Sequence, residues 1–404
     1  MMNMMLTVPP PAKLLRSVAL LIALTVLADA SSAAAATPPV LTSSFSGPAV
    51  PVFDTTTQAC DATDTPDAPA RAYRDSNGIV HLHASGSTNR AMTGNSLLTV
   101  ARNCAVVMNS ALDPNPAHFA QAQWLAGFYT NDGKNIAALV HTEYHGQHVP
   151  GQCLAAAANA AFYCWYNVIA FAQSTNGGQT FSESPAPRNY VAGLPYQFNK
   201  GLDGGPIGYN SPTGIVAAGR FYYAMLNDWP YRGQTYGPCL MRTSNVFDPT
   251  SWQGFDGKGF NVQFANPYVQ TRISNPAPFI CSPVGAGALG EVQSLVYHPA
   301  SGAYLTTQFT PDPRWGPPGL YLSASWDLLN WSKPLLVRST AAITAGDPAG
   351  KWLYEYFSLL DPAASDRSFS TITSNPMIYY VRLDMNNPPY KRVLFRRPLT
   401  LNVK

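Results

Sequence analysis

The feature that most constrains the fold is a pair of short strands around a tight turn, which recurs five times along the 404-residue chain. In each pair, aromatic and β-branched residues form the strands, and Gly, Pro, Asn or Asp supplies the turn. The five segments are DSNGIVHLHA, LAGFYTNDGKNIAALVHTEYHG, PTGIVAAGRFYYAMLND, VQSLVYHPASGAYLTTQF and FSLLDPAASDRSFSTITSNPMIYYVR. Helical periodicity is nearly absent, so the sequence predicts an all-β protein.

After most of these hairpins comes a third strand and then a turn followed by Trp or Phe, as in AFAQSTNGGQTF, LMRTSNVFDPTSW and YLSASWDLLNWSKP. Repeated units of three or four strands are typical of propellers, whose blades radiate from a central axis. Five units predict a five-bladed β-propeller of mostly four-stranded antiparallel blades. A β-sandwich, or two separate β domains, uses the same kinds of strand and remains the alternative.

The first 36 residues have the three parts of a secretory signal peptide. Lys13 and Arg16 precede the apolar run SVALLIALTVLADA, and the small residues SSAAAA follow it. Cleavage sites from Ala30 to Ala36 fit equally well. We therefore expect an exported protein, secreted or periplasmic.

Behind this peptide we expect an N-terminal linker over residues 37–60 and a single propeller domain over residues 61–404, with no membrane span. Removal of the peptide lowers the formal net charge from +3 to +2, and only 12% of residues are charged. That charge is too small and too scattered for a nucleic-acid binder. Aromatic residues make up 12% of the chain, which is compatible with a cleft that stacks rings on sugars.

All six cysteines lie behind the signal peptide, and an even count in an exported chain predicts disulfides. They are Cys60, Cys104, Cys153, Cys164, Cys239 and Cys281. Six cysteines allow 15 pairings. Pairing in chain order, first with second and so on, demands least of the fold. The spacing resembles no zinc site.

Two motifs resemble known propeller families. SASWDLLNWSKP resembles the outer-strand signature of the arabinanase-, xylosidase- and invertase-type five-bladed glycoside hydrolases. STNGGQTF, Ser174–Phe181, resembles the Asp-box turn of sialidase-like propellers, with Asn176 where Asp is usual. The resemblance in layout covers roughly residues 60–404. It implies hydrolysis of glycosidic bonds, with a furanose polymer such as an arabinan or fructan as substrate. Some relatives hold a calcium ion near the axis, but this sequence shows no ligand motif for one, and we predict no cofactor.

Propeller geometry separates two aspartates that look alike in the sequence. Loops that lead into the innermost strands open onto one face of the central funnel, and turns between the first two strands of a blade face the other side. Asp75, in RDSNG, belongs to such a turn and is expected to be structural. Asp67 precedes an innermost strand and is expected to face the funnel. The resemblance assigns Asp67 the role of general base, or of nucleophile as in the relatives that retain the anomeric configuration.

The same rule selects funnel residues in later blades: Asn210, Glu291, and Glu355 with Tyr356. The relatives place a general-acid glutamate at the start of a later blade, which points to Glu291. The densest polar cluster, HTEYHG, follows a second strand and offers Glu143 as the alternative acid.

The histidines of that cluster, His141 and His145, are not predicted to bind a metal, because they lie on opposite sides of a kink. The expected substrate-binding residues are drawn from several blades. They are Arg71, Asn89, Arg90, His141, Tyr144, His145, Trp165, Asn210, Asp228, Glu355 and Tyr356.

Carboxylates on opposite walls of a funnel would leave room for water and invert the anomeric centre, as they do at separations of roughly 6.5–9.5 Å.

Two other functions remain open. A sialidase needs an arginine cluster and a Tyr/Glu pair, which Arg71, Arg90, Arg232, Arg382, Arg396 and the YEY segment could supply, but sialidases resemble six-bladed propellers. A non-catalytic, lectin-like propeller would repeat similar pockets from blade to blade. The expected funnel residues differ between blades, which favours one asymmetric site. We predict a monomer whose partner is a carbohydrate.

Overall fold

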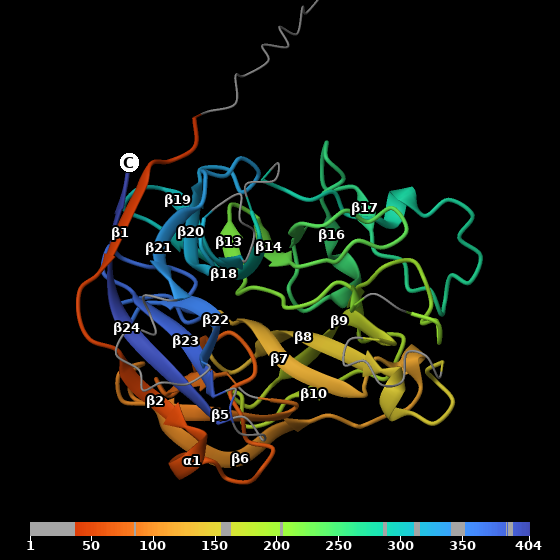
Figure 1. Ribbon diagram of the computed structural model, residues 1–404, viewed down its shortest axis with the longest axis horizontal. Coiled ribbons are helices and arrows are strands. Elements are labelled where there is room, and N and C mark those ends of the chain that lie inside the picture. Colours follow the sequence, from red (N-terminus) through yellow and green to blue (C-terminus); the bar gives the residue numbers. More distant parts are fainter. Residues whose placement is uncertain are drawn as a thin grey trace, which may run out of the picture. The chain divides into compact units, whose positions relative to one another are not determined.

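The computed structural model describes residues 37–84, 86–154, 163–202, 205–285, 289–310, 316–340, 352–384, 386 and 391–404. The expected signal peptide, residues 1–36, lies outside the described residues. Residues Thr37–Lys404 form one unit. In its described parts the strands form five sheets around a common centre (Figure 1), which confirms the predicted all-β, five-bladed propeller.

The blades follow one another along the chain, and pairing within them is antiparallel except for the short β12. Blade one contains β3 (Arg71–Arg74), β4 (Val80–His83), β5 (Thr88–Gly94) and β6 (Ala101–Asn109). Blade two contains β7 (Ala122–Tyr129), β8 (Ile136–His145), β9 (Trp165–Ser174) and β10 (Ser182–Glu183), with β11 (Tyr190–Ala192) and β12 (Ile207–Gly208) also on β9. Blade three contains β13 (Val216–Ala218), β14 (Phe221–Leu226), β15 (Cys239–Thr243), β16 (Gln253–Gly254) and β17 (Val262–Gln263). Blade four contains β18 (Glu291–His298), β19 (Ala303–Thr310), β20 (Gly319–Ser325) and β21 (Leu335–Ser339).

Blade five joins the two ends of the described chain. It contains β22 (Trp352–Leu360), β23 (Met377–Asp384) and β24 (Arg392–Val403), and β1 (Leu41–Phe45) and β2 (Val50–Asp54) both pair with β24. The segment 37–60, expected as a linker, therefore carries two strands of the propeller. The physical reason is the length of β24, whose 12 residues offer an edge to both short strands. In Figure 1, β1 runs alongside β24.

Helices are few and short in the described ranges. They are α1 (Thr55–Gln58) and the 3-10 turns η1 (Pro116–His118), η2 (Gly146–His148), η3 (Pro249–Ser251) and η4 (Ala277–Phe279). None of the helices that the structure describes is long and apolar enough to cross a membrane.

Three disulfides join Cys60 to Cys104, Cys153 to Cys164 and Cys239 to Cys281. The predicted pairing in chain order is confirmed. The bonds join cysteines 44, 11 and 42 positions apart, so none of them links distant parts of the chain.

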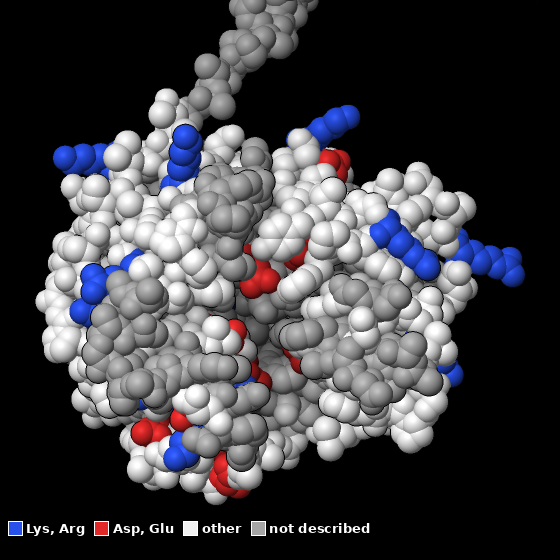
Figure 2. All heavy atoms as spheres, viewed as in Figure 1, with Lys and Arg blue, Asp and Glu red and all other residues white. Residues whose placement is uncertain are grey.

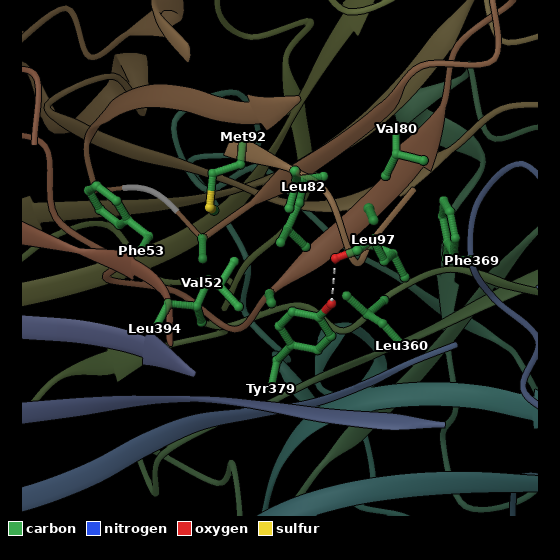
Figure 3. Packing of buried hydrophobic residues seen from close by; sticks show 14 of the residues in the cluster. Val52, Phe53, Val80, Leu82, Met92, Leu97, Leu360, Phe369, Tyr379 and Leu394 are labelled. Carbon is green, nitrogen blue, oxygen red and sulfur yellow. Dashed lines mark hydrogen bonds between the residues drawn. The ribbon is translucent and has the colours of Figure 1, made fainter. Parts of the chain in front are cut away.

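The hydrophobic core lies between the blades. One cluster packs β4 and β5 of blade one against blade five, with Leu82 and Met92 facing Leu360 and Tyr379 (Figure 3). The hydroxyl of Tyr379 donates to the backbone oxygen of Leu97 at 3.3 Å, so its polar end is satisfied inside the cluster. Apolar residues on both faces of each sheet thus pack blade on blade and leave polar side chains at the centre.

The turn between β3 and β4 forms as expected around Asp75. Its Oδ1 accepts hydrogen bonds from the backbone N–H groups of Asn77 and Ile79, both at 2.9 Å. Gly133, in the corresponding turn of blade two, has a φ of +72°, and a Cβ there would lie 2.4 Å from the Asp75 carbonyl carbon. The turns of blades one and two therefore pack together at the end of β3 away from Asp67.

Candidate active site

A cavity of about 270 Å³ lies where the inner strands converge. Figure 2 shows acidic side chains gathered around a hollow near the centre of the face in view. All five blades contribute to its lining. The lining residues are Asp67, Ala68, Pro69, Trp124, Ala126, His141, Glu143, Trp165, Asn167, Pro206, Asn210, Ser211, Trp229, Glu291 and Tyr356. We call this cavity the funnel.

Seven of the predicted site residues line the funnel. They lie either in an innermost strand or in the loop before it, or at the end of a second strand and the start of a third. Those from loops or inner strands are Asp67, Asn210, Glu291 and Tyr356, and those from β8 and β9 are His141, Glu143 and Trp165. The rule that separated Asp67 from Asp75 thus brings together residues that are far apart in the sequence.

Asp67 is held by two side chains from blade five. The hydroxyl of Tyr356 donates to its Oδ1 at 3.0 Å, and the guanidinium of Arg392 forms an ion pair with the same oxygen. Arg392 also donates to the backbone oxygen of Pro66 at 3.3 Å. Both partners contact the same oxygen, so they fix the orientation of the Asp67 carboxylate at the wall of the funnel.

Tyr356 reaches Asp67 from an unusual backbone position. The register between β22 and β23 shifts between Glu355 and Ser358, and Tyr356 has a φ of +60°. The left-handed region costs a residue with a Cβ roughly 1–2 kcal/mol. Such strain persists where surrounding structure imposes it, often at functional sites. Here it directs the Tyr356 hydroxyl to the funnel carboxylate.

Two glutamates near Asp67 favour the protonated form. Burial raises the pKa of Glu291, the first residue of β18. Burial also raises the pKa of Glu355 to about 7, and the negative charges of Asp67 and Glu291 act in the same direction, against the lowering effect of Arg392. The funnel therefore combines an ion-paired carboxylate, Asp67, with a carboxyl group, Glu291, that tends to keep its proton, and Glu355 is not among the lining residues.

Glu143 lies between two imidazoles. Nε2 of His145 is 2.8 Å from its Oε2, and Nε2 of His141 is 3.5 Å from its Oε1. Burial lowers the pKa of His141, although Glu143 opposes this shift. Among the described residues, no group of three His, Cys, Asp or Glu side chains is arranged to hold a metal ion.

Aromatic rings form much of the wall of the funnel. The sequence predicted one of the three tryptophans, Trp165, but not Trp124 or Trp229. Trp124, Trp165 and Trp229 line the funnel, and the indole N–H of Trp165 donates to Oδ1 of Asn167 at 2.8 Å. Trp229 follows directly after Asp228, which the sequence analysis selected from the same loop. Because neighbouring residues of an extended chain point in opposite directions, the choice between them depended on a register that the sequence does not show.

Arg71, expected to bind substrate, instead ties together the inner strands. Its Nη2 donates to the backbone oxygens of Gln293 at 2.6 Å and Pro212 at 3.2 Å, and its Nη1 donates to Oγ of Ser358 at 3.2 Å. Burial lowers the pKa of this guanidinium to about 9. Arg71 thus links blades one, three, four and five at the axis, and it does not line the funnel.

Asn89 and Arg90 are also occupied elsewhere. The amide of Asn89 donates to the backbone oxygen of Gln123 and accepts from the N–H of Leu125, which joins β5 to β7. Arg90 forms an ion pair with Asp61 at 2.5 Å. Neither side chain lines the funnel, so neither is part of the site that we propose.

Tyr144 and Asp228 stabilise loops beside the funnel without lining it. The Tyr144 hydroxyl donates to the backbone oxygen of Pro114 at 2.9 Å. Asp228 is buried and accepts from the side-chain amide of Gln234 and from the backbone N–H of Gly237 at 3.0 Å. Burial raises the pKa of Asp228 to about 8, despite these two hydrogen bonds.

The raised pKa of Asp228 predicts that the fold loses stability as the pH rises. The native state holds this proton up to about pH 8, whereas the unfolded chain releases it near the ordinary value of 3.8. The native state therefore binds more protons between these values, and its stability falls by up to about 1.4 kcal/mol per pH unit. We expect urea unfolding to show this slope between pH 5 and pH 8, and Asp228→Asn to reduce it, while the raised pKa of Glu355 still contributes below about pH 7. An equal slope in the variant would contradict the assignment.

Comparison with known proteins gives structural likenesses only. No family model matches the chain, and neither does any curated protein. The chain is similar to a thermostable family-43 glycoside hydrolase, with 10% identity over 86% of this chain and 95% of that chain and a TM-score of 0.44. It is similar to a glycosyl hydrolase from Bacteroides ovatus, with 11% identity, coverage of 83% and 84%, and a TM-score of 0.43. It is also similar to an exo-β-1,3-galactanase from Phanerochaete chrysosporium solved with β-1,3-galactotriose, with 11% identity, coverage of 88% and 64%, and a TM-score of 0.45. Likenesses of this strength carry no information on activity.

Proposed function

We propose that the chain is an exported glycoside hydrolase that cleaves glycosidic bonds in a poly- or oligosaccharide by carboxylate acid/base chemistry. The observation that carries this proposal is the contrast between two carboxyl groups in one funnel. Asp67 is paired with Arg392, whereas burial raises the pKa of Glu291. Glycosidic cleavage requires one ionised and one protonated carboxyl group on opposite sides of the bond.

In the proposed mechanism, Asp67 accepts a proton from water as the water attacks the anomeric carbon. Arg392 and Tyr356 hold Asp67 in place. Both of them contact Oδ1, so Oδ2 takes part in neither of these two contacts. Glu291 donates its proton to the oxygen of the leaving sugar as the glycosidic bond breaks. Attack by water itself inverts the anomeric centre, in keeping with the wide separation expected for residues of blades one and four.

Glu143 serves better as a partner for sugar hydroxyls than as the acid. Its two carboxylate oxygens face His145 and His141. Each oxygen of Glu143 therefore lies beside a ring nitrogen, which competes with the oxygen of a leaving sugar for contact with it. In this proposal Trp124, Trp165 and Trp229 stack on the apolar faces of the sugar rings. A furanose polymer, such as an arabinan or fructan, remains the first substrate class to test.

The test is release of reducing sugar from a panel of arabinans, fructans, xylan, arabinogalactan and sialylated glycans. We expect the purified protein to hydrolyse one class of these glycans. NMR should show that the first-formed product has the anomeric configuration opposite to that of the substrate. No hydrolysis of any glycan by the folded protein would contradict the proposal and favour a lectin-like propeller. Release of sialic acid would favour the sialidase alternative.

A further inference from the structure

A second cavity, of about 450 Å³, adjoins the loop that connects β14 to β15. Its lining includes Tyr196, Lys200, Tyr231 and Arg232, and we call it the basic groove. Its lining residues include two cations and no carboxylate, whereas the lining of the funnel includes three carboxylates and no Lys or Arg. The two cavities therefore differ in the charge of the ligand that they would attract.

The basic groove and the funnel share a loop. Trp229 lines the funnel, and Tyr231, two residues later, lines the basic groove. The Cα atoms of these residues lie at most about 7 Å apart, because each residue spans no more than about 3.6 Å. A sugar chain that leaves the funnel past Trp229 would therefore come close to the basic groove.

Arg232 occupies a backbone position that favours other residues. The backbone groups of Tyr231 and Gln234 exchange two hydrogen bonds, of 3.1 and 2.9 Å, around Arg232 and Gly233. Both central residues have positive φ, +44° for Arg232 and +97° for Gly233, as in a type I′ turn. Asn, Asp or Gly is preferred at the first of these positions. The turn itself does not favour an arginine, so its presence points to a role for the side chain.

The guanidinium of Arg232 is exposed and held by two rings. It lies 5.4 Å from the ring centre of Tyr196 and 5.2 Å from that of Tyr231. The Tyr196 hydroxyl donates to the backbone oxygen of Arg232 at 2.8 Å, and the two tyrosine rings meet edge to face at 5.6 Å. No carboxylate among the described residues forms an ion pair with this guanidinium. An arginine positioned over aromatic rings keeps its N–H donors available for an oxyanion.

We propose that the basic groove binds an anionic substituent, a carboxylate or a sulfate ester, on the same glycan chain that the funnel cleaves. Arg232 binds the two anionic oxygens through paired N–H donors, Lys200 adds a second positive charge, and Tyr231 and Tyr196 contact the sugar ring. This inference rests on the proposed hydrolase activity and narrows its substrates to glycans that carry an anionic substituent, furanose polymers with such a substituent included.

Affinity electrophoresis tests binding without any need for turnover. The gels contain sodium polygalacturonate, its carboxyl-reduced form, or a sulfated galactan. We expect at least one of the two anionic polymers to retard the protein and the reduced polymer not to do so. Arg232→Gln combined with Lys200→Gln should weaken binding about tenfold or more, as the loss of a charge-assisted contact does. The matched control is Arg220→Gln, since Arg220 is also exposed and also lies over a ring, that of Phe221, but on the β13–β14 turn.

Arg232→Asn separates a ligand-binding role from a structural one. Asn-Gly is the preferred pair for this turn, so we expect the variant to melt no lower than the wild type while binding is lost. Retardation by the sulfated galactan alone would support the basic groove and assign it a sulfate ester. Equal retardation by the reduced polymer, wild-type affinity in the double variant, or an equal loss in Arg220→Gln would each overturn the proposal. Binding without hydrolysis of any polymer would contradict the hydrolase proposal and still support the basic groove.

Discussion

Replacement of Asp67 by asparagine is expected to lower kcat about 10²–10⁴-fold, the usual contribution of a general base. The amide keeps the size of the side chain and can still accept the hydrogen bond from Tyr356, but it cannot take a proton from water. Because Arg392 would lose its ionic partner, the variant should be compared with the wild type for folding by circular dichroism. The measurement is the initial rate of reducing-sugar release on the best substrate of the panel.

Asp75→Asn is the matched control for this variant. Asp75 lies eight positions later in the sequence, at the other end of β3, and an asparagine oxygen can accept the same backbone hydrogen bonds from Asn77 and Ile79. We expect its kcat to equal that of the wild type. Full activity in Asp67→Asn, or a dead Asp75→Asn that remains folded, would reverse the assignment of the two faces of the propeller and remove the basis of the mechanism.

Replacement of Glu291 by glutamine is expected to lower kcat by a similar factor on natural glycans but by much less on substrates with an activated leaving group. A nitrophenolate leaves without a proton, so its release needs no general acid. The pH profile should change as well. In the wild type, activity falls as the pH rises through the raised pKa of Glu291, because the acid loses its proton. In Glu291→Gln on an activated glycoside, this alkaline decrease should disappear.

Glu143→Gln is the comparison that decides which glutamate is the acid. We expect this variant to weaken substrate binding, seen as a raised KM, and to keep the alkaline decrease. If Glu143→Gln instead loses the alkaline decrease and recovers with activated substrates, Glu143 is the acid and the role proposed for Glu291 is wrong. The two profiles are measured on the same pair of substrates.

The residues that could be located from sequence are those whose position relative to a strand decides which way they face. Asp67 precedes a strand and Asp75 follows it, so propeller geometry alone separates them. The choice between Asp228 and Trp229 could not be made in this way. They are adjacent in an irregular loop, and hydrogen bonds from Gln234 and Gly237 turn Asp228 inward.

Arg392 shows a second limit of prediction from the sequence. It begins β24, 325 positions after Asp67, and nothing near it in the sequence marks it as a partner of a carboxylate. The pairing of β24 with β23, and the bulge that places Tyr356, bring both side chains to Asp67. Contacts between blades one and five depend on closure of the ring, which is a property of the whole chain.

The sequence by itself predicted the class of fold, the number of blades and, as the least demanding of 15 pairings, the disulfides. These features depend on strand periodicity, turn residues and the order of neighbours along the chain. Only the tertiary structure decided that Arg71 and Asn89 hold blades together, that β1 and β2 complete blade five, and that Trp124 and Trp229 line the funnel. A polar or aromatic side chain near the axis can face a neighbouring strand or the cavity, and the packing of all five blades selects between them.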